Sequence, residues 1–194
     1  MSEFFFYNIP MKKVVHPIFF ERPTLVVAKN LLGKFLVRRR GKRISAYMIT
    51  EVEVYDGYRD KASHASRGQT ARNAPMFGPA GHWYVYFTYG MHWMLNIVTR
   101  EKGYPAAVLI RGVSPVRGPA RLTKKLHIDN KLNGRAATRA SGLWIEDRGA
   151  RVLPRAIKKS PRIGIDHAGE YWARRNLRFY LAGSELETVK PRRR

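Results

Sequence analysis

Residues 44–55 read ISAYMITEVEVY, and this stretch decides the fold because it predicts a long β-strand. Most of its residues are β-branched or apolar, the types that are enriched in strands. Residues 35–39 have the same character, and Arg40-Gly41-Lys42 between the two runs has the composition of a turn. We therefore expect two strands paired as a hairpin.

The last part of this strand carries a distinctive pattern of charge. Side chains alternate along a strand, so one face carries Val52 and Val54 and the other carries Glu51, Glu53 and Tyr55. Two carboxylates therefore lie beside a phenol in a protein with few acidic residues. General-base catalysis and an ion pair to Arg or Lys are the two explanations, and the spacing by itself favours the ion pair.

Short apolar runs separated by turn residues continue on both sides of this strand. One short helix is expected to begin at Pro23 and to end at Gly33, and a second to run from Gly118-Pro119 to Leu126. Further strands are expected at residues 82–89, 94–99, 106–113, 144–145 and 177–181.

These elements predict a mixed α/β fold: a single domain over residues 1–194 with a curved, mostly antiparallel β-sheet surrounded by short helices and long loops. Residues 1–19 are expected to form an irregular lead-in and residues 189–194 a basic tail. Residues 56–81 hold four glycines and two prolines among polar residues. Loops of this length are often functional.

Residues 82–93 contain six aromatic side chains in twelve positions. Alternation places Tyr84 and Tyr86 on one face of a strand, whereas the face expected to meet the core carries Trp83, Val85, Phe87 and Tyr89. Tyr89 precedes Gly90 at the strand end, where a ring can protrude. Aromatic rings beside basic side chains suit nucleic acid, because every base offers a face for stacking at roughly 1–3 kcal/mol. Core packing is the better explanation for about half of these six rings.

The charge balance points to an anionic partner. There are 37 Lys and Arg residues against 14 Asp and Glu, which gives a formal net charge of +23 and a pI of about 10.9. Nucleic acid is the first candidate and an anionic membrane surface the alternative. Phosphate contacts confer affinity without sequence information, so the charge indicates the partner and not the reaction.

Several chemistries lack their residues in this chain. Without cysteine there is no disulfide and no thiolate metal site. His82 and His92 have no close acidic partner or metal-binding spacing, and no phosphate loop or dinucleotide fingerprint occurs. We therefore expect no metal and no cofactor. The apolar residues 4–7 are too few for a signal peptide or membrane span, so we expect a cytoplasmic protein, nucleoid-associated in a prokaryote or nuclear in a eukaryote.

Several longer motifs follow one another in a fixed order. They are EVEVY at 51–55, SHA at 63–65, GQTARN at 68–73, MF at 76–77, YVYFTYGMH at 84–92 with Asn96, LIRG at 109–112, GPARL at 118–122, RIGI at 162–165, HAGE at 167–170 and LRFY at 177–180. Together they resemble the alkyladenine (3-methyladenine) DNA glycosylase family over roughly residues 20–183.

The resemblance implies a catalytic group of three residues. Glu53 matches the general base that activates the attacking water, while Arg111 and the backbone carbonyl of Ile163 match groups that help to place this water. A carboxylate near the sugar can both deprotonate water and stabilise oxocarbenium-like charge.

The resemblance also implies a pocket for a base that is extruded from the duplex. Tyr55 and Tyr86 match its two faces, His64 its edge, and Asn96 a residue that crowds the exocyclic amino group of guanine. Tyr89 matches the side chain that enters the duplex through the minor groove and fills the vacated space.

Further DNA contacts are expected from Met91, His92, Thr70 and Arg72. The chain departs from the family pattern at Ala71, where proline is usual, and at Asp166, where some relatives have glycine. The loop after the pocket histidine is also one residue shorter than in vertebrate relatives. These differences affect loop contacts and lesion preference rather than the chemistry.

The sequence therefore predicts a monofunctional glycosylase of base-excision repair that acts on alkylated or deaminated purines, the class of 3-methyladenine, hypoxanthine and ethenoadenine. The expected partner is double-stranded DNA with a damaged purine, without a membrane or an obligate protein partner, and the protein is expected to be a monomer. A glycosylase with a lysine nucleophile is disfavoured because no lysine occupies the motif positions named above. The other alternative is a non-catalytic minor-groove DNA-binding protein with Tyr89 as an aromatic wedge.

Overall fold

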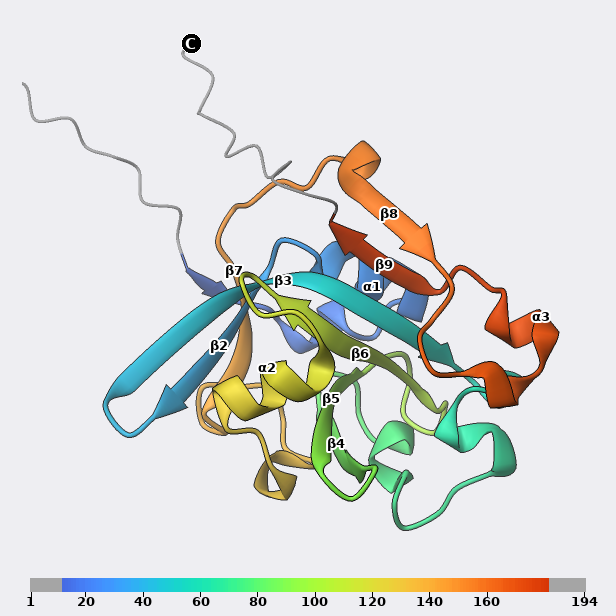
Figure 1. Ribbon diagram of the computed structural model, residues 1–194. Helices are drawn as coiled ribbons and strands as arrows, with labels where there is room; N and C mark the ends of the chain where they lie inside the picture. The colour runs from blue at the N-terminus through green and yellow to red at the C-terminus, as the bar shows by residue number, and fades with distance from the viewer. Residues whose placement is uncertain (1–11, 182–194) are drawn as a thin grey trace, which may run out of the picture.

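The computed structural model describes residues 12–181, and this part of the chain forms one nine-stranded sheet with short helices around it (Figure 1). Every strand pairing in it is antiparallel. The predicted mixed α/β fold with a mostly antiparallel sheet is confirmed. The strands are β1 (Lys13–Val14), β2 (Phe35–Arg40), β3 (Arg43–Asp56), β4 (Trp83–Thr88), β5 (His92–Val98), β6 (Ala106–Val113), β7 (Leu143–Asp147), β8 (Ile157–Ser160) and β9 (Arg178–Leu181).

The long strand β3, cyan in Figure 1, is the axis of the sheet. Its first half pairs with β2 as the predicted hairpin. Its second half pairs with β6 along one edge and with β9 along the other. The main path through the sheet is β1-β7-β2-β3-β6-β5-β4, and β8 extends it beyond β9. The segment around Glu53 therefore lies between two neighbouring strands.

Bulges interrupt the pairing of β3 with β6 on both sides of Glu51. The register shifts leave Thr50 on β3 and Arg111 on β6 as extra residues. A bulge re-aims the side chain of its extra residue, and the guanidinium of Arg111 lies within hydrogen-bond distance of Glu51 and Glu53. Gly112 permits this close approach, because a Cβ atom there would lie 3.2 Å from Cβ of Glu51.

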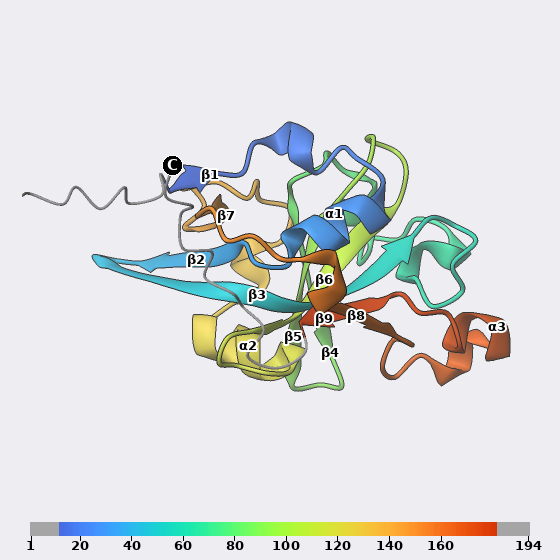
Figure 2. The same cartoon turned by 90° about the horizontal axis from the view of Figure 1, so that it is seen from above.

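The helices are α1 (Thr24–Leu31), α2 (Pro119–Leu126) and α3 (Glu170–Ala173). The two predicted helices are confirmed, since α1 begins directly after Pro23 and α2 begins at Pro119. Figures 1 and 2 show α1 and α2 on opposite sides of the sheet, while α3 lies beside the end of β3. Leu31 of α1 and Leu122 of α2 are fully buried in the main hydrophobic core.

The prediction for the aromatic strand β4 is partly wrong. Trp83 and Val85 lie in the main core as predicted, but Phe87, which alternation also assigned to the core, is 44% exposed. Tyr89 is 77% exposed; alternation placed it on the same face, but its exposure agrees with the prediction that its ring can protrude at the strand end. The reason is that β4 is the last strand of the sheet, and the tip of its hairpin with β5 projects beyond the packed layers (Figure 1). Phe87 instead packs against Trp93 across the hairpin, with ring centroids 4.8 Å apart.

Strand β8 was not predicted, because its sequence IKKS has only one large apolar residue. The loop at residues 56–81 contains the 3-10 helices η2 (His64–Arg67) and η3 (Ala74–Phe77). Strand β1 and η1 (Pro17–Phe19) lie within the predicted lead-in, and the predicted tail at 189–194 lies outside the described residues. No helix in the described range is long and apolar enough to cross a bilayer. The remaining 3-10 helices are η4 (Asn130–Leu132), η5 (Pro154–Ala156) and η6 (Asp166–Ala168).

Candidate active site

A cavity of about 410 Å³ lies where the second half of β3, the β4–β5 hairpin and the segment before η6 meet. Met94 and Leu109 contribute to an apolar part of its wall. The structure gathers in this wall most of the residues that were assigned to catalysis and base binding, together with Tyr89, which was assigned to entering the duplex. The residues of the first group are Tyr55, His64, Tyr86, Asn96, Arg111 and Ile163.

Glu53 lies directly behind this wall, with a side chain that is 0% exposed. Its Oε1 accepts a hydrogen bond from the backbone N–H of Ile163 at 2.9 Å. Its Oε2 accepts one from the hydroxyl of Tyr55 at 3.0 Å and one from Nη1 of Arg111 at 3.2 Å. All three donors belong to residues of the cavity wall. A carboxylate has about four acceptor positions, so three bonds leave one for a water molecule.

The environment of Glu53 makes it a better base than an ordinary glutamate. Burial raises its pKa above the usual value of 4.5, because the charged form loses its hydration. The guanidinium of Arg111, the N–H of Ile163 and the hydroxyl of Tyr55 lower this pKa again, but only in part. A general base is most effective when its pKa approaches the working pH.

Both tyrosines of the predicted base pocket have a guanidinium near the ring. The guanidinium carbon of Arg162 lies 4.8 Å from the ring centroid of Tyr55, and that of Arg72 lies 5.3 Å from the centroid of Tyr86. Burial raises the pKa of Tyr86 to about 12, so its hydroxyl stays protonated at neutral pH. The pocket is therefore lined by two uncharged phenol rings, each with an arginine guanidinium close to it.

Arg162 is held by a buried ion pair with Asp60. Its Nη1 and Nη2 donate to the two carboxylate oxygens at 2.6 and 2.9 Å, and Nη1 also donates to the carbonyl of Val54. The ion pair joins the loop after β3 to the segment that contains Ile163. It therefore supports the N–H group that contacts Glu53.

His64 and Asn96 are tied to β4 through Tyr84. Nδ1 of His64 lies 2.9 Å from the Tyr84 hydroxyl oxygen, and Nδ2 of Asn96 donates to the Tyr84 carbonyl at 3.1 Å. Loss of hydration and the nearby charge of Arg72 lower the pKa of His64. Neutral imidazole can donate one hydrogen bond and accept another, which suits recognition of a base edge.

The tip of the β4–β5 hairpin projects apolar side chains at the mouth of the cavity. Three residues, Tyr89 to Met91, separate the paired Thr88 and His92. Tyr89 and Gly90, with φ values of 52° and 64°, are the central residues of a β-turn that the Met91 N–H closes by donating to the Thr88 carbonyl at 3.2 Å. Tyr89 is 77% and Met91 66% exposed, whereas His92 at the start of β5 is half-buried. A large ring held on a rigid turn can enter a partner without first becoming ordered.

The two DNA contacts predicted in the loop before β4 lie in different settings. Arg72 lines the cavity, and its Nη2 donates to the carbonyl of Phe87 at 2.9 Å. Thr70 is exposed outside the cavity wall and forms a turn with Asn73 through reciprocal hydrogen bonds of 2.7 and 3.3 Å. Arg72 is therefore positioned by the hairpin itself.

Glu51, the other carboxylate of the strand, lies in ion pairs. Its Oε1 accepts from Nε of Arg111 at 3.0 Å and from Nε of Arg178 at 2.7 Å. The ion-pair explanation is thus correct for Glu51, and Glu53 combines an ion pair with a place behind the cavity. Within residues 12–181, no cluster of three His, Asp or Glu residues could hold a metal ion.

The family model described as methylpurine-DNA glycosylase (MPG) matches residues 18–118 and 114–185 of this chain. The chain belongs to this family. It is therefore a DNA glycosylase, a hydrolase that acts on N-glycosyl bonds, and the resemblance stated from the motifs is confirmed.

Individual relatives extend the comparison. Proteins named "Putative 3-methyladenine DNA glycosylase" are 43% identical over 178 residues in Legionella pneumophila strain Paris and 44% identical over 182 residues in Methanocella arvoryzae. The first alignment covers 88% of this chain and 95% of the relative, and the second 84% and 89%. A relative with the same name in Carboxydothermus hydrogenoformans is 41% identical over 191 residues.

Three groups in the site were not singled out from the sequence. They are the Tyr84 hydroxyl, which contacts His64, and the ion pair of Arg162 with Asp60, in which Arg162 lies near the ring of Tyr55. Tyr84 was recognised only as a strand residue, and no spacing links Asp60 to a residue 102 positions away. For Arg162 the only signal was its place beside Ile163 in a motif.

Proposed function

We propose that the protein hydrolyses the bond between a damaged purine and its deoxyribose after the nucleotide has been extruded from duplex DNA. The observation that carries the proposal is Glu53, a buried carboxylate with a raised pKa directly behind the wall of an aromatic cavity. Its neighbours Arg111 and Ile163 reach the same cavity, so a water bound between them and Glu53 would face the occupant.

In this reaction Glu53 accepts a proton from water, and the water oxygen forms a bond with C1′ of the sugar. The C1′–N bond breaks and its electron pair leaves with the base. A purine alkylated on a ring nitrogen is cationic and leaves as a neutral molecule, whereas a neutral lesion must take up a proton. Arg111 orients the carboxylate and, with the carbonyl of Ile163, the water.

The base would lie between Tyr55 and Tyr86, with His64 at its edge. A cationic purine gains from contact with the electron-rich ring faces. Asn96 is buried and fixed by its bond to the Tyr84 carbonyl, so it cannot move away from an exocyclic amino group. We expect this rigidity to disfavour guanine, while 3-methyladenine, hypoxanthine and ethenoadenine are accepted.

Tyr89 would fill the space left in the duplex, with Met91 and His92 beside it and Thr70 and Arg72 near the backbone. A damaged base that pairs or stacks poorly costs less to extrude, which adds to the selectivity. We expect the protein to act as a monomer on DNA in the cytoplasm, at the nucleoid or in a nucleus, without a cofactor.

The test is excision from a duplex with one hypoxanthine or ethenoadenine. The protein should release the free base and leave an alkali-labile site, and borohydride should trap no covalent complex. Glu53→Gln should bind the same duplex and lose excision by about 10²-fold or more. Intact strands after alkali despite tight binding would favour a non-catalytic minor-groove binder, and excision at the original rate by Glu53→Gln would refute the assigned base.

A further inference from the structure

Glu51 connects the catalytic group to the edge of the sheet without lining the cavity. Its Oε1 accepts from both Arg111 and Arg178, and Nη1 of Arg178 donates in turn to Oγ of Ser160 on β8 at 3.0 Å. The side chains of Glu51 and Arg178 are 15% and 23% exposed, so neither is fully buried. A continuous chain of charges therefore runs from Glu53 to β8.

Arg111 spans two carboxylates in this chain. Its Nε contacts Glu51 and its Nη1 contacts Glu53, at 3.0 and 3.2 Å. A guanidinium group is planar, so two contacts on different nitrogen atoms fix the orientation of the whole group. Because Arg111 is the extra residue of a bulge, the regular sheet pairing does not fix its direction.

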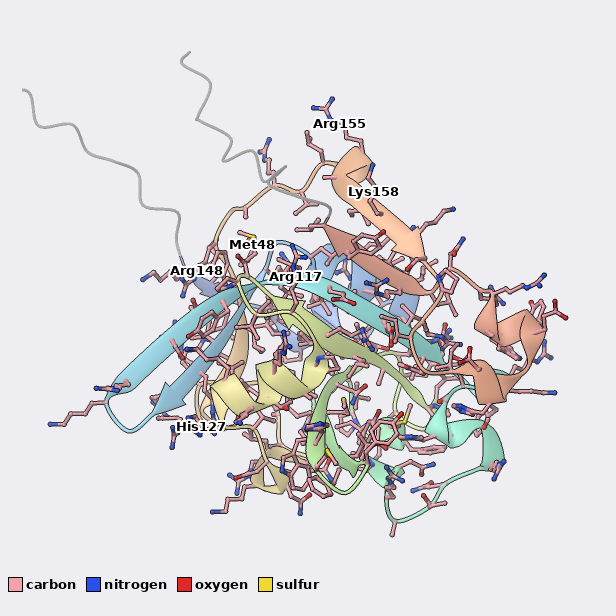
Figure 3. All side chains as sticks on the ribbon, in the orientation of Figure 1. Met48, Arg117, His127, Arg148, Arg155 and Lys158 are labelled. Atoms are coloured by element: carbon pink, nitrogen blue, oxygen red, sulfur yellow. The ribbon has the colours of Figure 1, made fainter. Side chains whose placement is uncertain are left out.

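The charged groups around Glu53 come from four segments. Arg111 lies on β6, Arg178 lies opposite Glu53 on β9, and Arg162 lies beside Ile163 with its charge paired to Asp60. Strand β3 itself contributes Glu51 and the Tyr55 phenol. On β8, Lys158 is exposed opposite Tyr180, and Figure 3 shows it on that outer strand together with Arg155 beside it.

We propose that Glu51 is a positioning residue for the glycosylase reaction, which holds the guanidinium of Arg111 against the Glu53 carboxylate. Together with Arg178, it determines how much positive charge Arg111 presents to that carboxylate. The inference rests on the proposed function. Glu51 does not touch the substrate in this scheme, and it acts through Arg111 alone.

Two substitutions should have opposite effects on the pH dependence of excision. Glu51→Gln keeps an acceptor oxygen but removes a negative charge, so Arg111 stabilises the Glu53 carboxylate more strongly and its protonation requires a lower pH. Arg178→Gln removes a positive charge from Glu51, which then compensates Arg111 more fully. The acidic limb of the pH–rate profile should move to lower pH in Glu51→Gln and to higher pH in Arg178→Gln, by about 0.5–1 pH unit.

The experiment is single-turnover excision of hypoxanthine from a duplex between pH 4.5 and about 9, with each variant checked by thermal melting. Glu51→Asp keeps the charge and shortens the reach, so the rate should fall about 10-fold with the acidic limb in place. Glu146→Gln is the matched control, because Glu146 is a buried carboxylate that forms an ion pair with the partly exposed Arg148. Figure 3 shows Arg148 on the side of β7 and β2, across the molecule from α3.

The inference would be overturned if the acidic limb stayed in place in both Glu51→Gln and Arg178→Gln, or if it moved in the same direction in both. If Glu51→Gln does not fold, the other two variants still test the inference. Arg178→Gln should move the acidic limb to higher pH, and Glu51→Asp should lower the rate with the acidic limb in place. Failure of the proposed function would look different, because the unsubstituted protein would then leave no abasic site or Glu53→Gln would remain active.

Discussion

The second half of β3 and the tip of the β4–β5 hairpin both reach the same cavity, yet they are built in opposite ways. Glu53 is fully buried, and its carboxylate accepts hydrogen bonds from Tyr55 on the same strand, from Arg111 on β6 and from the backbone N–H of Ile163. Tyr89 is 77% exposed in the three-residue loop between β4 and β5, at the end of the last strand of the sheet. In the proposed function, the chemical step that needs a defined pKa therefore lies in the centre of the sheet, and the contact with DNA lies at its free edge.

This contrast predicts that substitutions in the two regions will impair the protein for different reasons. A change near β3 should alter stability and the chemical step together, because the site and the core share the same residues. A change at the hairpin tip should leave stability intact and alter only the steps that involve DNA.

The largest stability effect is expected for Arg162→Met. The side chains of Arg162 and Asp60 are 0% and 1% exposed, so removal of the cation leaves a buried carboxylate with backbone N–H donors but without a charged partner. Such a loss costs about 3–5 kcal/mol, which corresponds to a decrease in Tm of about 10 °C in a domain of this size. Thermal melting at pH 7 measures it.

The double variant Asp60→Asn with Arg162→Met provides the control for this prediction. It removes both charges, so it should recover a large part of the lost stability. If the single variant melts within about 1 °C of the unsubstituted protein, the ion pair does not support the site and the contrast between the two regions weakens.

A smaller effect, confined to DNA processing, is expected for Tyr89→Ala. Stacking of one base on an aromatic ring contributes roughly 1–3 kcal/mol, so the single-turnover excision rate should fall about 10-fold or more. Its Tm should remain unchanged, because substitutions at exposed positions usually alter stability by less than about 0.5 kcal/mol.

Tyr171→Ala is the matched control for this tyrosine. Tyr171 on α3 is 67% exposed and does not line the cavity, so its loss should leave excision unchanged. Equal rates for Tyr89→Ala and the unsubstituted protein would remove the reason for an aromatic ring at the hairpin tip.

The sequence predicted the elements that carry a regular pattern. The alternation in residues 49–55 correctly placed Glu51, Glu53 and Tyr55 on one face, and Pro23 and Gly118-Pro119 correctly located the starts of two helices. The resemblance to a family then identified side chains that the structure gathers around one cavity.

What could not be predicted depends on contacts between distant segments. Arg111 meets Glu53 across 58 positions, and the pairing of β3 with β6 that brings them together leaves no local signal in the sequence. Alternation assigned Phe87 to the core, because sequence periodicity carries no information on where the neighbouring layers end. The buried Asp60 has the sequence context of an ordinary loop residue.

The smallest effect is expected for Arg72→Gln, which tests whether the positive charge beside the β4–β5 hairpin contributes to DNA binding. Arg72 is exposed, and its Nη2 contact with the Phe87 carbonyl fixes it beside the cavity. If it neutralises one phosphate, DNA affinity should fall modestly and the slope of log K against log salt should decrease by about 1. Arg155→Gln, at the β8 edge in Figure 3, should change neither quantity if DNA binds at the hairpin. An equal loss in both variants would mean that the net charge of +23, rather than the hairpin edge, directs the protein to DNA.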